Sequence, residues 1–152
     1  MFKAAIIELI IRGIPEIAII VWVCFVLAKM RIKLKKYLIS TLILVGSSYV
    51  VMNLPINKGL NTLLTVGALI LINVKINEMS VIKSIQVGFL SYILEFICEL
   101  INIIMIKYLF KADITKVFSN VYSKTLYGIP SLLLLVLFTI IISVLMKRQS
   151  KQ

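Results

Sequence analysis

Apolar residues in this chain come in long uninterrupted runs, and these runs leave few folds open to it. Hydrophobic residues make up 61% of the 152 residues and charged residues only 15%. Soluble domains are nearer half apolar and a quarter charged. Because runs of this length and hydrophobicity are typical of membrane-crossing helices, we predict an all-α fold, a polytopic transmembrane helical bundle.

Five spans can be drawn on this pattern, at residues 14–28, 37–52, 60–74, 82–108 and 129–146. The segment 53–59 contains Asn, Pro and Gly and predicts a turn. The loop 111–124 is more polar and looks amphipathic around residues 114–122. Residues 2–11 form a short apolar lead-in, which we expect to form a short interfacial helix or to extend the first span. We therefore predict one integral membrane domain, residues 1–152, without a separate soluble domain.

The tripeptide Gly-Ile-Pro occurs twice, at residues 13–15 and 128–130. Glycine adds flexibility, and proline suits the first turn of a helix because its missing N–H is not needed there. We expect the first copy to open span one and the second to open span five. Convergent use of helix-start residues accounts for the repeat better than a duplication does.

Basic residues outnumber acidic ones by 17 to 6, which gives a net charge of +11. They lie at the ends of the apolar runs, where they meet lipid head groups, so we expect no nucleic-acid binding. Five of them crowd into residues 29–36, and ten in all fall on that side of the five-span arrangement against seven on the other. This bias predicts a multi-pass cell-membrane protein with its N-terminus outside and its C-terminus in the cytoplasm. The first apolar stretch has no small-residue cleavage site, so no cleavable signal peptide is expected.

Several chemistries are excluded by the residues that the chain lacks. It contains no histidine, and its two cysteines, Cys24 and Cys98, both fall inside predicted spans, where we expect them to act as small packing residues. A Cys/His nucleophile pair and a histidine-rich metal site are therefore impossible. No P-loop, G-x-S-x-G, H-E-x-x-H or Rossmann pattern is present. We predict that the protein is not an enzyme and uses no cofactor or metal.

Small and polar residues form a stripe along the fourth predicted span. They recur at steps of four and three, a spacing that puts them on one face of a helix. The stripe consists of Ser84, Gly88, Ser91, Glu95, Cys98 and Asn102, with Glu99 one turn beyond Glu95. Small residues at this spacing let helices approach closely, so most of the stripe predicts a packing face inside the bundle.

Glu95 lies near the middle of this span, and Glu99 lies one turn towards the outer side. Carboxylates at this depth must face protein or water rather than lipid. Because two ionised carboxylates on adjacent turns repel, we expect at least one to be protonated at neutral pH. One interpretation is a proton, cation or ligand site. The other is hydrogen bonding to Ser, Thr, Asn or Tyr side chains on neighbouring spans, for example Ser47, Ser48, Tyr49 or Thr65.

Arg12 and Glu16 are four residues apart at the entrance of span one. An ion pair within the helix is the favoured interpretation. The alternative has Glu16 facing the bundle together with Glu95 and Glu99. The candidate ligand-binding or coupling residues are therefore Glu16, Glu95, Glu99 and Asn102.

Three short motifs and one acidic residue carry a resemblance to a known family. They are Gly-Ile-Pro-Glu at 13–16, Asn-Leu-Pro-Ile-Asn at 53–57 with Gly59, Glu95 in the long span, and Leu-Tyr-Gly-Ile-Pro at 126–130. In these the chain resembles the polytopic sensor region of accessory-gene-regulator-type peptide receptor histidine kinases of Gram-positive bacteria. In that family a helical bundle receives an extracellular cyclic peptide and passes the signal to a histidine kinase. Since this sequence ends at Gln152 and has no histidine, the resemblance implies a sensor-like module without its kinase domain.

Two main functions follow as expectations. The first is a non-enzymatic membrane sensor-like or signalling-partner protein that acts through helix–helix contacts. The second is a small membrane transport protein, or the substrate-binding subunit of a transporter, with an intramembrane carboxylate site. A structural or assembly factor without a ligand is a third. The expected partners are the lipid bilayer, a histidine kinase or another membrane protein, and a second copy of the chain.

Overall fold

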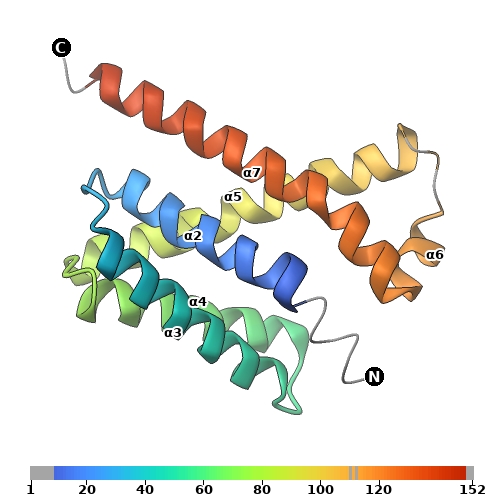
Figure 1. Cartoon of the computed structure of the whole chain (residues 1–152), viewed down its shortest axis with the longest axis horizontal. Helices are drawn as coiled ribbons and strands as arrows, with labels where there is room; N and C mark the ends of the chain where they lie inside the picture. Colours follow the sequence, from blue (N-terminus) through green and yellow to red (C-terminus); the bar gives the residue numbers. More distant parts are fainter. Residues whose placement is uncertain (1–8, 110, 112, 150–152) are drawn as a thin grey trace.

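The computed structural model describes residues 9–109, 111 and 113–149, and within them it consists of helices joined by turns, without a β-strand (Figure 1). The elements in chain order are a turn of π-helix, η1 (Leu9–Gly13), and the helices α2 (Ile14–Leu27), α3 (Leu34–Met52), α4 (Lys58–Lys75), α5 (Val81–Tyr108), α6 (Ile114–Ser119) and α7 (Val121–Gln149). The predicted all-α bundle is thereby confirmed.

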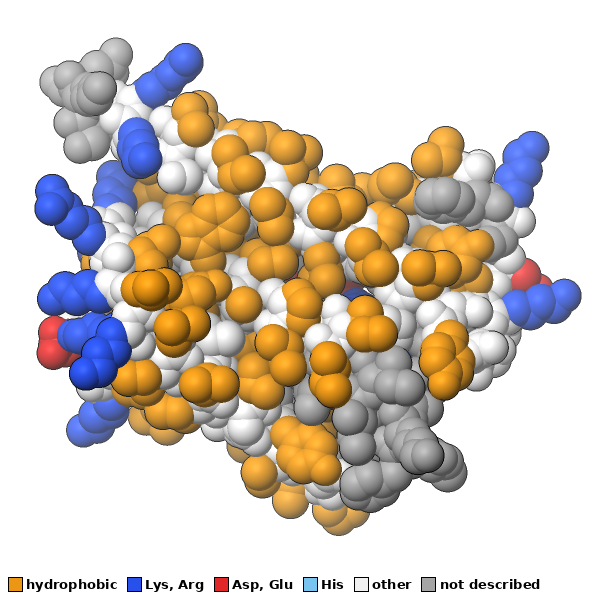
Figure 2. Space-filling model, viewed as in Figure 1, with side chains coloured by type: hydrophobic (Ala, Val, Ile, Leu, Met, Phe, Trp, Pro, Cys, Tyr) orange, Lys and Arg blue, Asp and Glu red, His pale blue; other side chains and the backbone are white. Residues whose placement is uncertain are grey.

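Four helical segments are long and apolar enough to cross a membrane: Ile10–Leu27, Leu34–Met52, Val81–Tyr108 and Tyr122–Arg148. Gly59–Lys75 is a shorter apolar helix. These segments correspond to the five predicted spans. Large apolar side chains on their outer faces are exposed, among them Leu42, Ile82 and Leu133. Figure 2 shows such side chains spread over the surface between two ends that carry the Lys and Arg side chains. This surface suits lipid contact, and the chain is a multi-pass membrane protein.

The apolar lead-in is described only from Leu9 onward, and its part before that residue lies outside the described residues. Leu9–Gly13 forms η1 and runs directly into α2, so these residues extend the first span instead of forming a separate interfacial helix. Pro15 lies in the first turn of α2, as expected from its missing N–H.

The second Gly-Ile-Pro copy does not open a helix, and the expectation that span five begins there is wrong. The helix α7 already begins at Val121, and Pro130 lies inside it. A proline removes one helical hydrogen bond, but it kinks a helix without ending it when the surrounding structure holds both halves in place. The predicted loop 111–124 accordingly contains the short helix α6, which Asp113 caps by accepting a hydrogen bond from the Thr115 N–H at 3.1 Å.

The helix α5 is central and packs against α2, α4 and α7. Figure 1 shows α7 crossing α5, with α6 at the end where α5 leads into α7. The helices α5 and α7 are each roughly 42 Å long at 1.5 Å per residue. This length exceeds the roughly 30 Å thickness of a bilayer's hydrocarbon core, so α5 and α7 must tilt within the bilayer or protrude from it.

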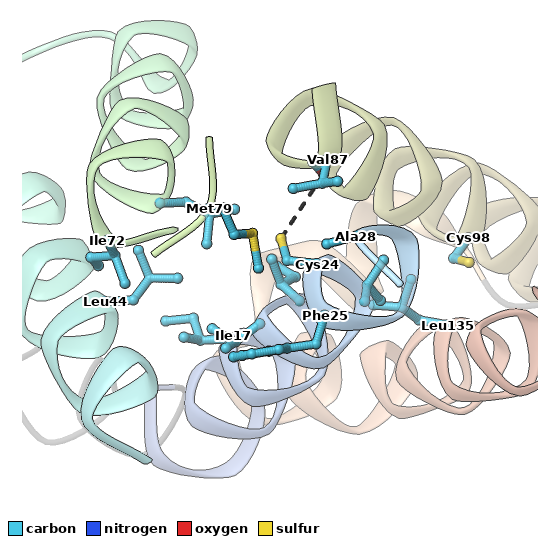
Figure 3. Close-up of a cluster of buried hydrophobic side chains, with 14 residues drawn as sticks. Ile17, Cys24, Phe25, Ala28, Leu44, Ile72, Met79, Val87, Cys98 and Leu135 are labelled. Carbon is cyan, nitrogen blue, oxygen red and sulfur yellow. Dashed lines mark hydrogen bonds between the residues drawn. The ribbon is translucent and has the colours of Figure 1, made fainter. Parts of the chain in front are cut away.

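Side chains from α2 form the middle of the apolar core. Cys24 and Phe25 of α2 pack in one cluster with Leu44 of α3 and Ile72 of α4 (Figure 3). The Cys24 thiol lies 3.2 Å from the Ser91 hydroxyl of α5. Cys24 and Cys98 are both buried and free, and Figure 3 shows them on different parts of the core, in agreement with their predicted packing role.

Two asparagines hold the turn between α4 and α5 against α3. Asn77 donates to the Asn73 side-chain oxygen at 3.0 Å and accepts from the Ser40 hydroxyl at 3.0 Å. Outside this buried group, Lys36 lies 2.6 Å from Glu78. The hydrogen bond from Lys36, and then its positive charge, hold the pKa of Glu78 below its usual range. This end of the bundle is therefore fastened by polar contacts that the spacing of apolar residues did not predict.

Candidate functional site

The polar stripe of α5 faces the inside of the bundle. Ser84, Ser91, Cys98 and Asn102 are buried. Gly88 is buried as well, and a Cβ atom there would lie 3.0 Å from the Ile70 side chain of α4. The small residue at this position therefore permits the close approach of α4 and α5, as predicted for a packing face.

Arg12, in η1 directly before α2, connects this end of the chain to α5. Its Nε lies 3.2 Å from Glu16 Oε2, which is the predicted ion pair within the helix. Its Nη2 also donates to Glu99 Oε1 on α5. The Arg12 side chain is only 13% exposed, whereas that of Glu99 is 42% exposed. One partly buried cation therefore bridges two carboxylates that are 83 positions apart in the sequence.

Glu95 completes a cluster of three carboxyl groups, so the alternative in which Glu16 faces the bundle also holds. The Glu16 side chain lies within hydrogen-bond range of Glu95. Two carboxyl groups can share a hydrogen bond only when one of them carries a proton, because an ionised carboxylate is an acceptor alone. Glu95 Oε2 is buried and accepts no hydrogen bond from a donor in the described part of the chain.

The four predicted hydrogen-bond partners on neighbouring spans do not reach Glu95. Ser47 donates to the Ile43 carbonyl and Thr65 to the Asn61 carbonyl, each at 2.8 Å within its own helix. Tyr49 is exposed. Among the described residues, Ser48 Oγ has no partner at all. In the described part of the chain, none of these four side chains therefore supplies a hydrogen bond to Glu95.

The helix α7 forms the third side of the cluster, at the proline-containing segment that was predicted as a helix start. A Cβ atom on Gly128 would lie 3.0 Å from both Nε and Nη1 of Arg12. Asn102, a predicted candidate, donates from Nδ2 to the Tyr127 carbonyl at 2.8 Å, and its Oδ1 has no partner in the described part. Ser131 donates to the Gly128 carbonyl at 2.6 Å. Side chains thus satisfy carbonyls near the hydrogen bond that Pro130 removes.

A cavity of about 780 Å³ lies beside this cluster, among α2, α3, α4 and α5. Its walls include apolar side chains such as Val51, Val66, Phe89 and Phe96. Arg12, Glu16, Glu95 and Glu99 line it together with Lys124. The cavity therefore combines a mostly apolar wall with a charged region on one side.

Two further polar residues of this cavity come from α3 and α4. Ser48 Oγ and Asn61 Oδ1 are buried, line the cavity and lack a hydrogen-bond partner among the described residues. The Ser48 residue is only 8% exposed. Sequence reasoning named Ser48 only as a partner for Glu95 and did not single out Asn61, because nothing local to either residue shows that it borders a cavity.

The carboxylate cluster is not arranged as a metal centre. Within the residues that the structure describes, no group of three or more His, Cys, Asp or Glu side chains is placed to hold a metal ion. What the arrangement can do chemically is exchange a proton between carboxyl groups, bind a hydrogen-bond donor, or move Arg12 between acceptors.

No protein-family model matches this chain, and it is similar to no curated protein and to no solved structure. The resemblance to peptide receptor kinases stays a prediction, and the geometry of the cluster and the cavity is what bears on function.

Proposed function

We propose that this protein is a non-enzymatic membrane receptor of the sensor type. It binds an amphipathic ligand in the cavity and transmits occupancy as a change in the packing of α7. The observation that carries this proposal is the position of Arg12. Its guanidinium pairs with Glu16 of α2 and Glu99 of α5, lies against Gly128 of α7, and lines the cavity.

The size and lining of the cavity support a ligand site. Small-molecule sites have volumes of roughly 300–1,000 Å³ and are mostly apolar with a few polar groups, and the cavity here has about 780 Å³. A ligand that engages Glu99 or Glu95 competes with Arg12 for the same carboxylates. Because Arg12 also contacts α7, such competition gives the bound and unbound states different helix packing, which is the requirement for a population shift.

The distribution of charge supports a direction for the signal. The cavity is lined by the first turns of α2 and α4 and the last turn of α3, while the basic residues 29–36 lie at the opposite ends of α2 and α3. With the basic end in the cytoplasm, the cavity lies in the outer half of the membrane and the N-terminus is outside. The last turn of α7, with Lys147 and Arg148, then reaches the cytoplasmic side. A histidine kinase or another membrane protein there is the proposed partner.

The proposal is tested by the distance between α5 and α7. Spin labels at Ile104 and Leu137, both exposed, would be placed in a chain whose two cysteines are changed to alanine. In Glu99→Gln, which removes the charge that Arg12 binds, we expect the distance measured by pulsed electron resonance to shift by about 2 Å. Glu78→Gln is the matched control, since this carboxylate lies outside the cluster. Unchanged distances in both Glu99→Gln and Arg12→Gln would contradict the proposal.

A proton-coupled carrier is the second candidate, favoured by the proximity of Glu16 and Glu95. The two functions differ in reconstituted vesicles. A carrier loses proton movement in Glu95→Gln while the protein still inserts, whereas a sensor has the same low proton permeability before and after the substitution. Proton movement that depends on Glu95 would replace the sensor proposal with the carrier.

A further inference from the structure

We infer that the ligand of this cavity is an amphipathic amine, which enters with a positively charged ammonium group and an apolar body. The inference rests on the proposed function, because it takes the cavity to be a ligand site. It names the chemical class of ligand, which the proposed function leaves open.

Charge is the first argument. The charged side chains of described residues that line the cavity are three carboxyl groups and two cations, namely Glu16, Glu95, Glu99, Arg12 and Lys124. Both ion pairs of Arg12 go to Glu16 and Glu99. Glu95 is left with the Glu16 carboxyl as its neighbour. Glu95 has no ion pair of its own with Arg12, so a ligand cation beside it supplies a positive charge directly at this carboxyl group. In surroundings of low polarity the attraction is much stronger than in water.

The second argument is independent of charge and comes from hydrogen bonding. Glu95 Oε2, Asn61 Oδ1 and Ser48 Oγ border the same cavity from three helices and have no partner in the described part of the chain. The Asn61 oxygen is an acceptor only, Glu95 Oε2 is an acceptor when the proton shared with Glu16 lies elsewhere, and the hydroxyl oxygen can accept as well. An ammonium group has three N–H donors and no acceptor, so it matches this set. A carboxylate or phosphate ligand would meet acceptors with acceptors.

The apolar body follows from the rest of the wall. Val51, Val66, Phe89 and Phe96 line the cavity around the polar atoms. An alkyl or aromatic group beside these side chains is removed from water, which favours binding by about 25 cal/mol per Å² of apolar surface. A small inorganic cation would leave this wall without a partner.

The experiment compares three probes that share an eight-carbon chain. The full-length protein in nanodiscs of zwitterionic lipid is titrated calorimetrically with octylamine, octanol or octyltrimethylammonium, and empty nanodiscs are the blank. We expect saturable binding of octylamine, about tenfold tighter than that of octanol, which is neutral, and of octyltrimethylammonium, which has no N–H. Glu95→Gln should weaken octylamine about tenfold and leave octanol unchanged.

A matched pair of serines tests the hydrogen-bond argument. Ser48→Ala and Asn61→Ala should each weaken octylamine several-fold, by the loss of one hydrogen bond. Ser47→Ala is the control, because this neighbour bonds within its own helix and does not line the cavity. If Glu95→Gln does not fold, two tests still decide whether the cavity prefers an amine. These are the comparison of the three probes on the unchanged chain and the octylamine affinities of Ser48→Ala and Asn61→Ala.

The outcomes separate the ligand class from the proposed function. If octanol binds as tightly as octylamine, and Val66→Trp, which narrows the cavity, weakens both, the amine inference is overturned and the cavity remains a ligand site. Equal affinity for octylamine and octyltrimethylammonium overturns the role of N–H donation. If no probe binds saturably, the amine inference also fails. The proposed receptor function is then judged separately by the distance between Ile104 and Leu137.

Discussion

The guanidinium of Arg12, in η1 directly before α2, lies against the backbone of Gly128 on α7, so close that a side chain at position 128 would have to displace it. A Cβ atom at position 128 would be 3.0 Å from two guanidinium nitrogens. Glycine is therefore favoured here by the close approach of an ion-paired side chain, and not by the backbone conformation of a helix start. The contact links the helix that enters the cavity to the last helix of the bundle.

Gly128→Ala should destabilise the protein by about 1–3 kcal/mol, because the added methyl group displaces Arg12 from its ion pairs. The free energy of unfolding in mixed micelles measures this. Gly46→Ala and Gly67→Ala are matched controls, since a Cβ atom there meets nothing within 4 Å. Both controls should be neutral or stabilising by up to about 1 kcal/mol, as for glycine replaced in a helix interior. Equal losses at all three positions would remove the special role of Gly128.

Arg12→Met should cost about 3 kcal/mol, because it leaves the Glu16 and Glu99 carboxylates without their cation. Adding Glu16→Gln and Glu99→Gln to Arg12→Met should recover part of the loss, since the uncompensated charges are then gone. The unfolding free energies of the single, double and triple variants give the interaction energy among Arg12, Glu16 and Glu99. Simple additivity of the losses would mean that the three side chains do not act together.

Asn102→Leu should destabilise the protein by about 1 kcal/mol, because the hydrogen bond to the Tyr127 carbonyl is lost. Hydrogen exchange around Ser131 should become faster, since that carbonyl lies next to the turn that Pro130 interrupts. Pro130→Ala restores a helical N–H and should slow exchange in the same segment. Unchanged exchange in both variants would show that the interruption does not limit the local stability of α7.

The pair formed by Lys36 and Glu78 gives a pH dependence outside the membrane. The pKa of Glu78 is lowered in the folded chain by Lys36, so the pair stabilises the fold at pH values above the ordinary glutamate value of 4.5. That contribution is lost as the pH falls below this value and Glu78 becomes protonated. We expect the Glu78 carboxyl resonance in NMR to titrate at a higher pH in Lys36→Gln than in the unchanged chain. Identical titration curves would mean that the pair does not form in solution.

The orientation can be tested with single cysteines in the cysteine-free chain. Lys116→Cys on α6 should react with a membrane-impermeant maleimide in intact cells, whereas Lys33→Cys should react only after lysis. Both positions are exposed at opposite ends of the bundle. Labelling in the reverse order would place the cavity in the cytoplasmic half and overturn the outward-facing receptor.

The carboxylate cluster was only partly predictable from the sequence. Glu95 and Glu99 attract notice because charged residues are costly in an apolar run, and Glu16 is conspicuous for the same reason. The sequence alone left open whether Arg12 pairs locally or whether Glu16 faces α5, and the structure combines both. Ser48 and Asn61 carry no local signal, since a buried polar atom without a partner is recognised only when its surroundings are known.

The sequence by itself determined the helices and the inward face of α5. Hydrophobic run length decides which segments suit a membrane, and a period of three to four residues decides which side chains share a face. Only the tertiary structure decided that α7 continues through Pro130, that Gly128 receives Arg12, and that three carboxyl groups meet beside one cavity. The physical reason is that helix propensity and hydrophobicity act along the chain. Contacts between residues such as Arg12 and Glu99, 87 positions apart, depend on how the helices cross.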